Sequence, residues 1–374
     1  MENEFRLLIV GRSYGVKSET FIDNHIEYLN GEKRLIYGRR WDMINVEGDF
    51  IWPVRRYFQH VLSAITNLDD AYWFRGSVKK VLQEQQPSAI LAQFGPAGEF
   101  LYPAAKELDI PLFVHFHGFD ISRYLILWRF RKKFAKMAEQ AQGLFVVSER
   151  MVEQLLKMGV PREKIILNPY GVDPKLFEPK NSGSSEEPTF LMVGRLVAKK
   201  APHLSIQAFI EAKKSINGGD NPLKLRIIGD GPLRKHCEVL IKKNGMERDI
   251  QILGFQTPDE ISRHMNEAMA FVQHSVTAWD GNMEGLPLAI IEAQMSGKPV
   301  ISTVHAGIPD IVAHGETGYL VAEKDVKGMA EFMTKMATDP ELVSQMGVRA
   351  RERALKKFTL QQHIQGIQKQ LDAL

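Results

Sequence analysis

Short apolar runs recur along this chain, and each is followed by a polar or glycine-containing turn and then by a helix-like segment. In the first half the runs are "FRLLIVG", "AILAQFG", "PLFVHFHG" and "GLFVVS". In the second half they are "TFLMVGR", "LKLRIIGDGP", "IQILGF", "MAFVQHS", "KPVISTV" and "GYLVA". Such alternation is typical of parallel sheets covered by helices, so the sequence predicts an α/β fold.

The pattern is interrupted once, at residues 168–188, "NPYGVDPKLFEPKNSGSSEEP", which are rich in proline, glycine, serine and acidic residues. A chain of 374 residues is also longer than one hydrophobic core commonly organises. We therefore expect two Rossmann-like domains, at 1–172 and 173–357, and a terminal helix over 358–374 that can pack back on the first. Two such domains face each other across a cleft, where ligands are expected.

The composition limits the possible functions. Hydrophobic residues make up 44% and charged residues 25%, as in folded globular proteins. A net charge of +3 gives no reason to expect nucleic-acid binding, and the single cysteine, Cys237, excludes an internal disulfide. The start "MENEFRLLIVGR" lacks the basic residues of a signal peptide, and no uncharged apolar run reaches roughly 18 residues. We expect a cytoplasmic protein that is at most peripheral at the inner face of the membrane.

Residues 284–293, "EGLPLAIIEA", place a proline between two glutamates. Proline suits a first helical turn because the donor it lacks is not needed there, so a helix should begin near Leu286 or Pro287. Glu284 then precedes the helix and Glu292 lies inside it. The amides and positive dipole at the helix start favour an anion. Alternatively, Glu284 only stabilises the dipole, by at most about 1 kcal/mol.

Basic residues follow another strand directly, in "VGRLVAKKAPHL" at 193–204. The carboxyl end of a strand is where a ligand cleft opens in α/β folds. Arg195 offers a planar fork of donors and Lys200 a point charge, a combination suited to a diphosphate. The alternative is a solvated basic loop.

Taken in order, several motifs resemble the family 4 glycosyltransferases. They are "VGRLVAKKAP", "IIGDGPLR", "ILGF", "EGLPLAIIEA", "GKPVISTVHAGIPDIV" and "GETGYLV", preceded by "SETFI", "HFHGFD" and "VVSERMVEQLLKMGVPREKIILNPYGVD". The resemblance covers nearly the whole chain, and its specificity comes from the ordered set. Two positions depart from the family pattern, since relatives often carry glycine at Ala306 and glutamate at Asp310. Neither change removes a group that the mechanism needs.

The resemblance implies a GT-B fold, with the nucleotide sugar held mainly by the second domain and the acceptor mainly by the first. Arg195 and Lys200 would hold the diphosphate, Glu292 the ribose and Glu284 the hydroxyls of the transferred sugar. His117 would face the reacting sugar. The other residues implied to contact the donor are Gly15, Gly229, Gly231, Gly254, Phe255, Gly285, Leu286 and Leu288.

The resemblance also implies transfer with retention of anomeric configuration, without a metal or a bound cofactor. Glycosidases too use paired acids, but those flank the anomeric carbon, whereas Glu284 and Glu292 would lie on one side of the donor. A front-face reaction is favoured, in which the leaving diphosphate helps take the acceptor proton. Arg195 and Lys200 would stabilise the charge that grows on the diphosphate.

The motif "HFHGFD" contains three further candidates. His117 is assigned to the site, although a histidine near a strand end can also be purely structural. His115 is expected to face the opposite side of the strand. Asp120 is expected to cap the helix that follows it.

Residues 122–140, "SRYLILWRFRKKFAKMAEQ", combine six basic residues with four aromatic ones, and no acid precedes Glu139. A basic helix with aromatic residues can lie on an anionic membrane, where a lipid-linked acceptor would be presented. It can equally be a helix that packs on the core and has a solvated basic side.

These observations predict a retaining hexosyl- or N-acetylhexosaminyltransferase of polysaccharide or glycoconjugate biosynthesis. The donor is expected to be a UDP-sugar, with a GDP-sugar second, and the acceptor a glycan or a lipid-linked sugar. The alternatives are a sugar-nucleotide epimerase of similar fold and a non-catalytic nucleotide-sugar-binding protein. Binding alone rarely needs Arg195, Lys200, Glu284 and Glu292 together, which disfavours the second. The sequence leaves open the identity of the sugar, the acceptor and the linkage.

Overall fold

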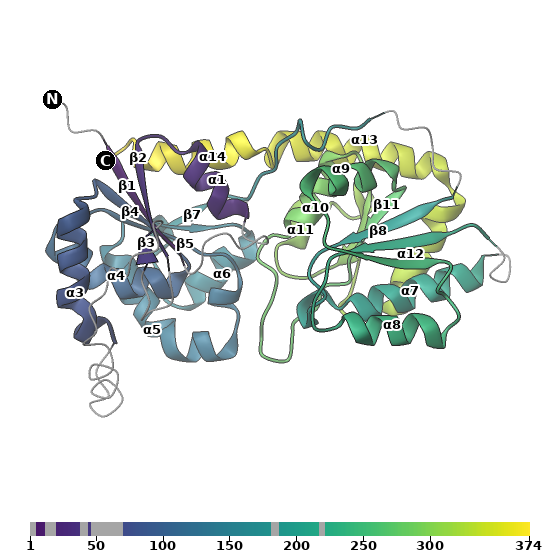
Figure 1. The fold of residues 1–374 in the computed structure, drawn as a ribbon, viewed down its shortest axis with the longest axis horizontal. Coiled ribbons are helices and arrows are strands. Elements are labelled where there is room, and N and C mark those ends of the chain that lie inside the picture. The colour runs from purple at the N-terminus through teal and green to yellow at the C-terminus, as the bar shows by residue number, and fades with distance from the viewer. Residues whose placement is uncertain (1–4, 12–19, 38–43, 46–69, 181–186, 217–220) are drawn as a thin grey trace. The chain divides into compact units, whose positions relative to one another are not determined.

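The computed structural model describes residues 5–11, 20–37, 44–45, 70–180, 187–216 and 221–374. The chain forms two compact units, Met1–Asn168 with Ile364–Leu374, and Pro169–His363. Each unit contains a mainly parallel sheet with helices on both faces (Figure 1). The predicted α/β class is therefore confirmed for both.

The sheet of the first unit has the strand order β3-β2-β1-β4-β5-β6-β7. Neighbouring strands are parallel except β2 and β3, which pair antiparallel at one edge. The order reverses direction between β1 and β4, and this reversal is the usual place of a ligand site in doubly wound sheets. The strands are β1 (Arg6–Gly11), β2 (Glu32–Tyr37), β3 (Ile44–Asn45), β4 (Ala89–Gln93), β5 (Leu112–His115), β6 (Gly143–Val146) and β7 (Ile165–Leu167).

Helices α3, α4 and α5 pack one against the next below this sheet in the view of Figure 1, and α1 lies above it. From Ile364 onward, α14 belongs to this unit, and the Gln368 side chain accepts a hydrogen bond from the Asn30 amide. The helices are α1 (Thr20–Tyr28), α3 (Asp70–Gln85), α4 (Gly95–Glu107), η1 (Phe119–Ile121), α5 (Tyr124–Gln140), α6 (Glu149–Lys157), η2 (Arg162–Lys164) and α14 (Leu360–Leu371).

The sheet of the second unit has six strands in a similar order, β10-β9-β8-β11-β12-β13, and every pair in it is parallel. Its core is built from fully buried side chains such as Phe190, Phe209 and Phe271. The strands are β8 (Thr189–Val193), β9 (Lys224–Ile228), β10 (Ile250–Gly254), β11 (Ala270–Val272), β12 (Val300–Thr303) and β13 (Gly318–Val321).

Two layers of helices cover the second sheet, with α7, α8 and α12 on one face and α9, α10 and α13 on the other (Figure 1). The helices are η3 (Ala198–Lys200), α7 (Pro202–Ser215), α8 (Arg234–Lys243), α9 (Pro258–Glu267), α10 (Leu288–Met295), α11 (Ile308–Ile311), α12 (Val326–Thr338) and α13 (Pro340–Lys357). Among the helices of the described residues, none is both long and apolar enough to cross a membrane.

All ten apolar runs identified in the sequence are strands, whereas β2, β3 and β7 were not predicted. Strand β2 begins with three charged residues, Glu32, Lys33 and Arg34, which are only partly buried and hide its strand character. Strands β3 and β7 have two and three residues, which is too short for a periodic signal.

Two glycines beside β13 provide a matched test of the packing between neighbouring strands. A Cβ at Gly318 would lie 2.0 Å from the Val300 carbonyl oxygen, whereas a Cβ at Gly315 would meet nothing within 4 Å. Both residues have positive φ, +155° and +80°. We expect Gly318→Ala to lower the free energy of unfolding by about 3 kcal/mol, and Gly315→Ala by about 1 kcal/mol. Equal urea midpoints for the two variants would contradict the close strand approach.

Candidate functional site

The predicted donor residues of the second unit lie at or after the ends of β8, β9, β10 and β11, and the strand order of the sheet reverses between β8 and β11. Lys200 comes from the segment after β8 and Gln273 follows β11 directly. The Lys200 Nζ donates a hydrogen bond to the Gln273 Oε1 at 3.2 Å, so the two strand ends are joined at this point. This is the position at which doubly wound sheets bind their ligands.

Glu284 is the central acid of this site. Its carboxylate is buried, and it lies 3.2 Å from the Lys200 Nζ and 3.3 Å from the Lys199 Nζ. Burial alone would raise the pKa of Glu284, but the charges of Lys199 and Lys200 lower it to about 2. Glu284 is therefore ionised throughout the neutral range.

Lys199 was not assigned to the site from the sequence, although it precedes Lys200 directly. Its Nζ also donates to the Met283 carbonyl oxygen at 3.2 Å. The doubled lysine in "VAKKAP" is the only signal that could have indicated it, because the sequence does not reveal that the 3₁₀ turn η3 points both amines toward one carboxylate.

Two glycines allow the backbone to approach closely around Lys200. Gly194 has a φ of +148°, and a Cβ there would lie 2.9 Å from the Lys200 Cδ. Gly229 has a φ of +130°, and a Cβ there would lie 2.1 Å from the Gly194 carbonyl oxygen. Its amide donates to the Gly254 carbonyl oxygen at 2.7 Å, which connects the loops after β9 and β10.

Two other predicted residues of these loops, Arg195 and Phe255, are exposed, and Gly231 is partly buried. Arg195 follows Gly194 and has an exposed side chain, and Gly231 lies in the loop after β9. Phe255, the residue after β10, has 64% of its surface exposed. An exposed ring beside a glycine loop is suited to stacking against a flat base.

Helix α10 begins at Leu288, and Pro287 is its N-cap residue with extended backbone angles. The predicted start near Leu286 or Pro287 was therefore one to two residues early. No side chain caps this helix start, and the preceding Gly285 and Leu286 are buried. Glu284 precedes the helix and Glu292 lies within it, as predicted.

Glu292 differs from Glu284 in its electrostatics. Burial raises the pKa of Glu292 to about 7, and the charge of Lys200 offsets only part of that shift. The two glutamates of "EGLPLAIIEA" thus have opposite pKa shifts within one loop and helix. They are not a pair of equivalent acids.

In the first unit, His117 follows β5, and its Nε2 is hydrogen bonded to the Gln93 Oε1 at 2.9 Å. Its ring stacks on Phe21 at a centroid distance of 4.3 Å and meets Phe94 edge-on at 4.5 Å. The Gln93 amide nitrogen lies 3.0 Å from the His25 Nδ1. His117 is thus held from two sides by aromatic rings and oriented by one buried amide.

The prediction that His115 faces the opposite side from His117 was wrong. The two rings stack at a centroid distance of 4.5 Å, because residues two apart in extended backbone point to the same side.

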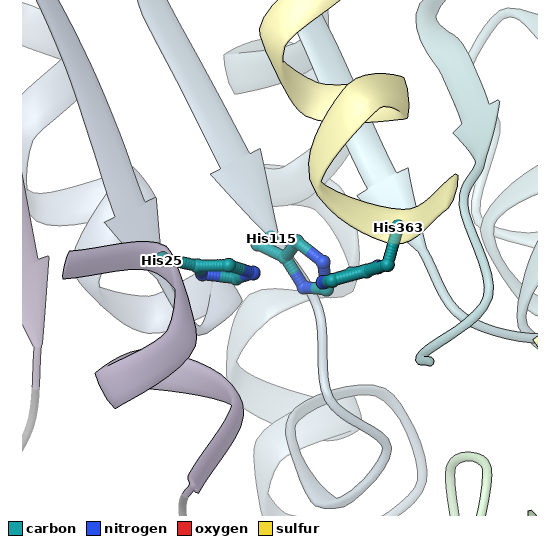
Figure 2. Close-up of side chains that lie close together, drawn as sticks. All are labelled: His25, His115 and His363. Atoms are coloured by element: carbon teal, nitrogen blue, oxygen red, sulfur yellow. The ribbon is translucent and has the colours of Figure 1, made fainter. Parts of the chain in front are cut away.

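Figure 2 shows His25, His115 and His363 close together. One ring nitrogen from each lies within 4.8 Å of the others. These three are the described residues that could hold a metal ion; His363 directly precedes the part of α14 that belongs to the first unit.

Asp120 does not cap the helix that follows it. Its carboxylate accepts hydrogen bonds from the amides of His117, Gly118 and Gly95, and Gly95 begins the earlier helix α4. Burial raises the pKa of Asp120 to about 6, although the three amides oppose the shift. Asp120 therefore fixes the turn that carries His117.

The structure brings Lys200, Glu284 and the glycine loops together in the second unit, and it places His117 in the first. Gly15 lies outside the described residues. Of the two departures from the family pattern, Ala306 has a φ of +46°. That left-handed conformation favours glycine, which gives a physical reason for the glycine of relatives. Asp310 lies in α11.

Two family models match the chain. One, described as glycosyl transferases group 1, matches residues 175–353, and the other, described as Glycosyltransferase Family 4, matches residues 45–176. Together they span most of both units.

Similar proteins and structures agree with these matches. The putative colanic acid biosynthesis glycosyltransferase WcaL of Escherichia coli (strain K12) is 33% identical over 278 residues, covering 72% of this chain and 67% of WcaL. The amylovoran biosynthesis glycosyltransferase AmsK of Erwinia amylovora is 34% identical, covering 73% and 67%. Anabaena HepE, solved in complex with UDP, aligns over 99% of this chain and 100% of HepE with a TM-score of 0.78 and 19% identity.

The opposite pKa shifts of the two glutamates predict opposite effects of charge removal on stability. Glu292 binds its proton more tightly in the folded protein. Its ionisation therefore lowers the free energy of unfolding as the pH rises from 4.5 to about 7, and this loss is absent below pH 4.5. Glu284 binds its proton less tightly, so its stabilisation is present above 4.5 and is lost as the pH falls toward about 2.

We therefore expect Glu292→Gln to raise, and Glu284→Gln to lower, the melting temperature of the nucleotide-free protein at about pH 8. The gain from Glu292→Gln should disappear on acidification to about pH 4.5. Differential scanning fluorimetry across this range measures both effects. A lower melting temperature for both variants at about pH 8 would contradict the assignment.

Proposed function

Because the chain belongs to the family 4 glycosyltransferases, we propose that it moves a sugar from a nucleotide-diphosphate donor to a glycan or lipid-linked acceptor with retention of configuration. A UDP-sugar is the favoured donor and a GDP-sugar the second choice. The observation that carries the proposal is the cluster of Lys199, Lys200 and buried Glu284 at the reversal of the second sheet.

The cluster suits a sugar diphosphate because it combines positive charge with a fixed acceptor. The Lys200 ammonium and the exposed Arg195 guanidinium would meet the diphosphate, together with the uncapped start of α10. Glu284, ionised and held by two lysines, would accept hydrogen bonds from the hydroxyls of the transferred sugar. Gly285, Leu286 and Leu288 would present backbone groups beside it.

Glu292 would hold the ribose, and the glycine loops with the exposed Phe255 ring would frame the base. Because the pKa of Glu292 is about 7, its carboxyl group is partly protonated at neutral pH. The protonated form can both accept and donate a hydrogen bond, which suits a diol. Neither glutamate then acts as a glycosidase acid. Charge on the leaving diphosphate would be stabilised by Lys200 and Arg195, so we expect that the reaction needs no metal.

His117 would face the reacting sugar from the first unit. Its imidazole is oriented by Gln93 and supported by Phe21 and Phe94. The acceptor proton would pass to the leaving diphosphate in a front-face reaction, and His117 would position the donor.

The relatives support a role in making polysaccharides. WcaL and AmsK are described as glycosyltransferases of colanic acid and amylovoran biosynthesis, and HepE was solved with UDP. We propose an analogous step in exopolysaccharide or glycoconjugate assembly, with the protein acting in the cytoplasm. A sugar-nucleotide epimerase or a silent nucleotide-sugar-binding protein would explain the fold but not the family membership.

A panel of UDP- and GDP-sugars, each tested for hydrolysis and for thermal stabilisation of the protein, would check the donor assignment. We expect one nucleotide class to raise the melting temperature and its sugar to be released slowly without an acceptor. If no nucleotide sugar shifts the melting temperature, the donor assignment fails. Stabilisation without release or transfer would favour the binding protein.

We expect Lys200→Met to weaken nucleotide-diphosphate binding about tenfold or more, because a charge-assisted hydrogen bond to phosphate is lost. Isothermal titration calorimetry measures this affinity. Lys214→Met provides the control, since Lys214 is exposed in the last turn of α7. Unchanged affinity in the Lys200 variant would contradict its role.

Helix α5 offers a surface for a membrane that presents a lipid-linked acceptor. Phe130 and Phe134 are buried in the core, whereas Tyr124, Leu125 and Trp128 are exposed, Trp128 over 83% of its surface. These three lie on one turn at the start of the helix, and exposed basic residues follow along it: Arg129, Arg131, Lys132 and Lys136. The inner side of the helix packs on the core, and its outer side is basic and aromatic. We propose that this outer side binds anionic lipid.

We expect the triple variant Trp128→Ser, Lys132→Glu, Lys136→Glu to lose salt-sensitive pelleting with vesicles that contain anionic lipid. The matched control is Val239→Ser, Lys242→Glu, Lys243→Glu on α8, where an exposed apolar residue also lies beside exposed lysines. Equal loss in both variants would indicate a general charge effect. Absence of salt-sensitive binding by the wild-type protein would exclude the membrane surface.

A further inference from the structure

We propose that His305 and Glu323 are positioning residues that hold Glu284 in place for sugar transfer, and that His305 must be neutral to do so. The proposal rests on the function proposed above for Glu284. Beyond that function, it assigns a role to two residues that follow β12 and β13, and it predicts that activity depends on pH. Neither residue was indicated by the sequence.

The hydrogen bonds of His305 define which of its nitrogens carries the proton. The Glu284 backbone N–H donates to the His305 Nε2 at 3.1 Å, so that nitrogen must be an acceptor. The proton is then on Nδ1, which donates to the Glu323 Oε1 at 2.6 Å. The His305 side chain is fully buried, so water does not substitute for either partner.

Glu323 is itself fixed by Thr277. Its Oε2 accepts from the Thr277 amide at 2.9 Å, and its Oε1 accepts from the Thr277 hydroxyl at 3.1 Å. Thr277, His305 and Glu323 follow β11, β12 and β13, which are neighbours in the sheet. Three adjacent strand ends are therefore connected to the backbone of Glu284.

This connection complements the lysines, which hold the other end of the same residue. Lys199 and Lys200 bind the Glu284 carboxylate, and His305 binds its amide. A carboxylate that accepts sugar hydroxyls must keep its position within a fraction of an ångström, and fixing both ends of the residue achieves that.

Protonation of His305 would break the arrangement. An imidazolium carries hydrogen on both nitrogens, so its Nε2–H would point at the N–H of Glu284, and two donors would meet. The charged groups facing His305 are the carboxylates of Glu323 and Glu284, the latter paired with Lys199 and Lys200. His274 lies near Glu323 and accepts from the Lys324 amide at 2.7 Å.

Activity should therefore fall on acidification, and the position of that fall should depend on the charge of Glu323. This dependence separates a charge-linked positioning role from simple packing.

The decisive variant is Glu323→Gln, measured as the pH profile of kcat/KM with the donor identified by the panel. The amide oxygen still accepts from the His305 Nδ1–H and the Thr277 hydroxyl, the amide NH2 takes the place of the oxygen that accepted from the Thr277 N–H, and the negative charge is removed. We expect the acid limb of the profile to move to lower pH, because a neighbouring carboxylate is removed. A profile that superimposes on that of the wild type would overturn the proposal.

A second variant, His305→Ala, should reduce kcat about tenfold or more while UDP affinity stays within about twofold, because Glu284 contacts the sugar rather than the nucleotide. The control is His314→Ala, since the His314 Nδ1 also accepts a backbone N–H, from Leu320 at 3.0 Å, but has no link to Glu284. Equal loss of kcat in both variants would contradict a specific role.

Nitrogen-15 NMR of histidine-labelled wild-type protein gives a readout that needs no enzymatic activity. We expect the His305 signals, assigned by comparison with His305→Ala, to show a protonated Nδ1 and an unprotonated Nε2 at neutral pH. A proton on Nε2 would overturn the proposal. If the tautomer is as expected but no nucleotide sugar is bound or used, the proposed function fails and the positioning contact stands.

Discussion

The site in the second unit depends on one buried carboxylate and the two lysines that keep it ionised. Removing a glutamate from water is costly, and burial alone would favour its neutral form. Lys199 and Lys200 reverse that preference for Glu284, whereas Glu292, with less compensation, has a pKa near 7. Gly194 leaves room for the Lys200 side chain, which a Cβ at that position would meet, and Gly229 allows the neighbouring strand end to approach the Gly194 carbonyl.

The fold could be predicted because its signal is repetitive. Ten short apolar runs, each followed by a turn and a helix, leave few alternatives to two doubly wound sheets. The strands that escaped prediction are short or charged at one end, as in β2, where pairing with β1 rather than hydrophobic patterning maintains the strand. The position of Glu284 before α10 and of Glu292 within it could also be derived, since a proline limits where a helix begins.

The partners of these residues could not be predicted, because they come from distant loops. Nothing in "VHAG" indicates that His305 reaches the amide of Glu284, or that Glu323, eighteen residues later, orients it. The error at His115 has a different origin, since residues two apart in extended backbone share a side and the rings of His115 and His117 stack. Asp120 does accept a hydrogen bond from the first residue of a helix, but that helix is α4, which lies earlier in the chain than the helix predicted.

The assignment of Ile364–Leu374 to the first unit has a consequence for biosynthesis. The second unit, Pro169–His363, is in effect inserted between the two segments of the first. During translation the second unit is fully synthesised before the final turns of α14 leave the ribosome. The first unit therefore reaches its complete set of contacts last, although its sheet is made first, and until then the surface that α14 covers is open to other proteins in the cell.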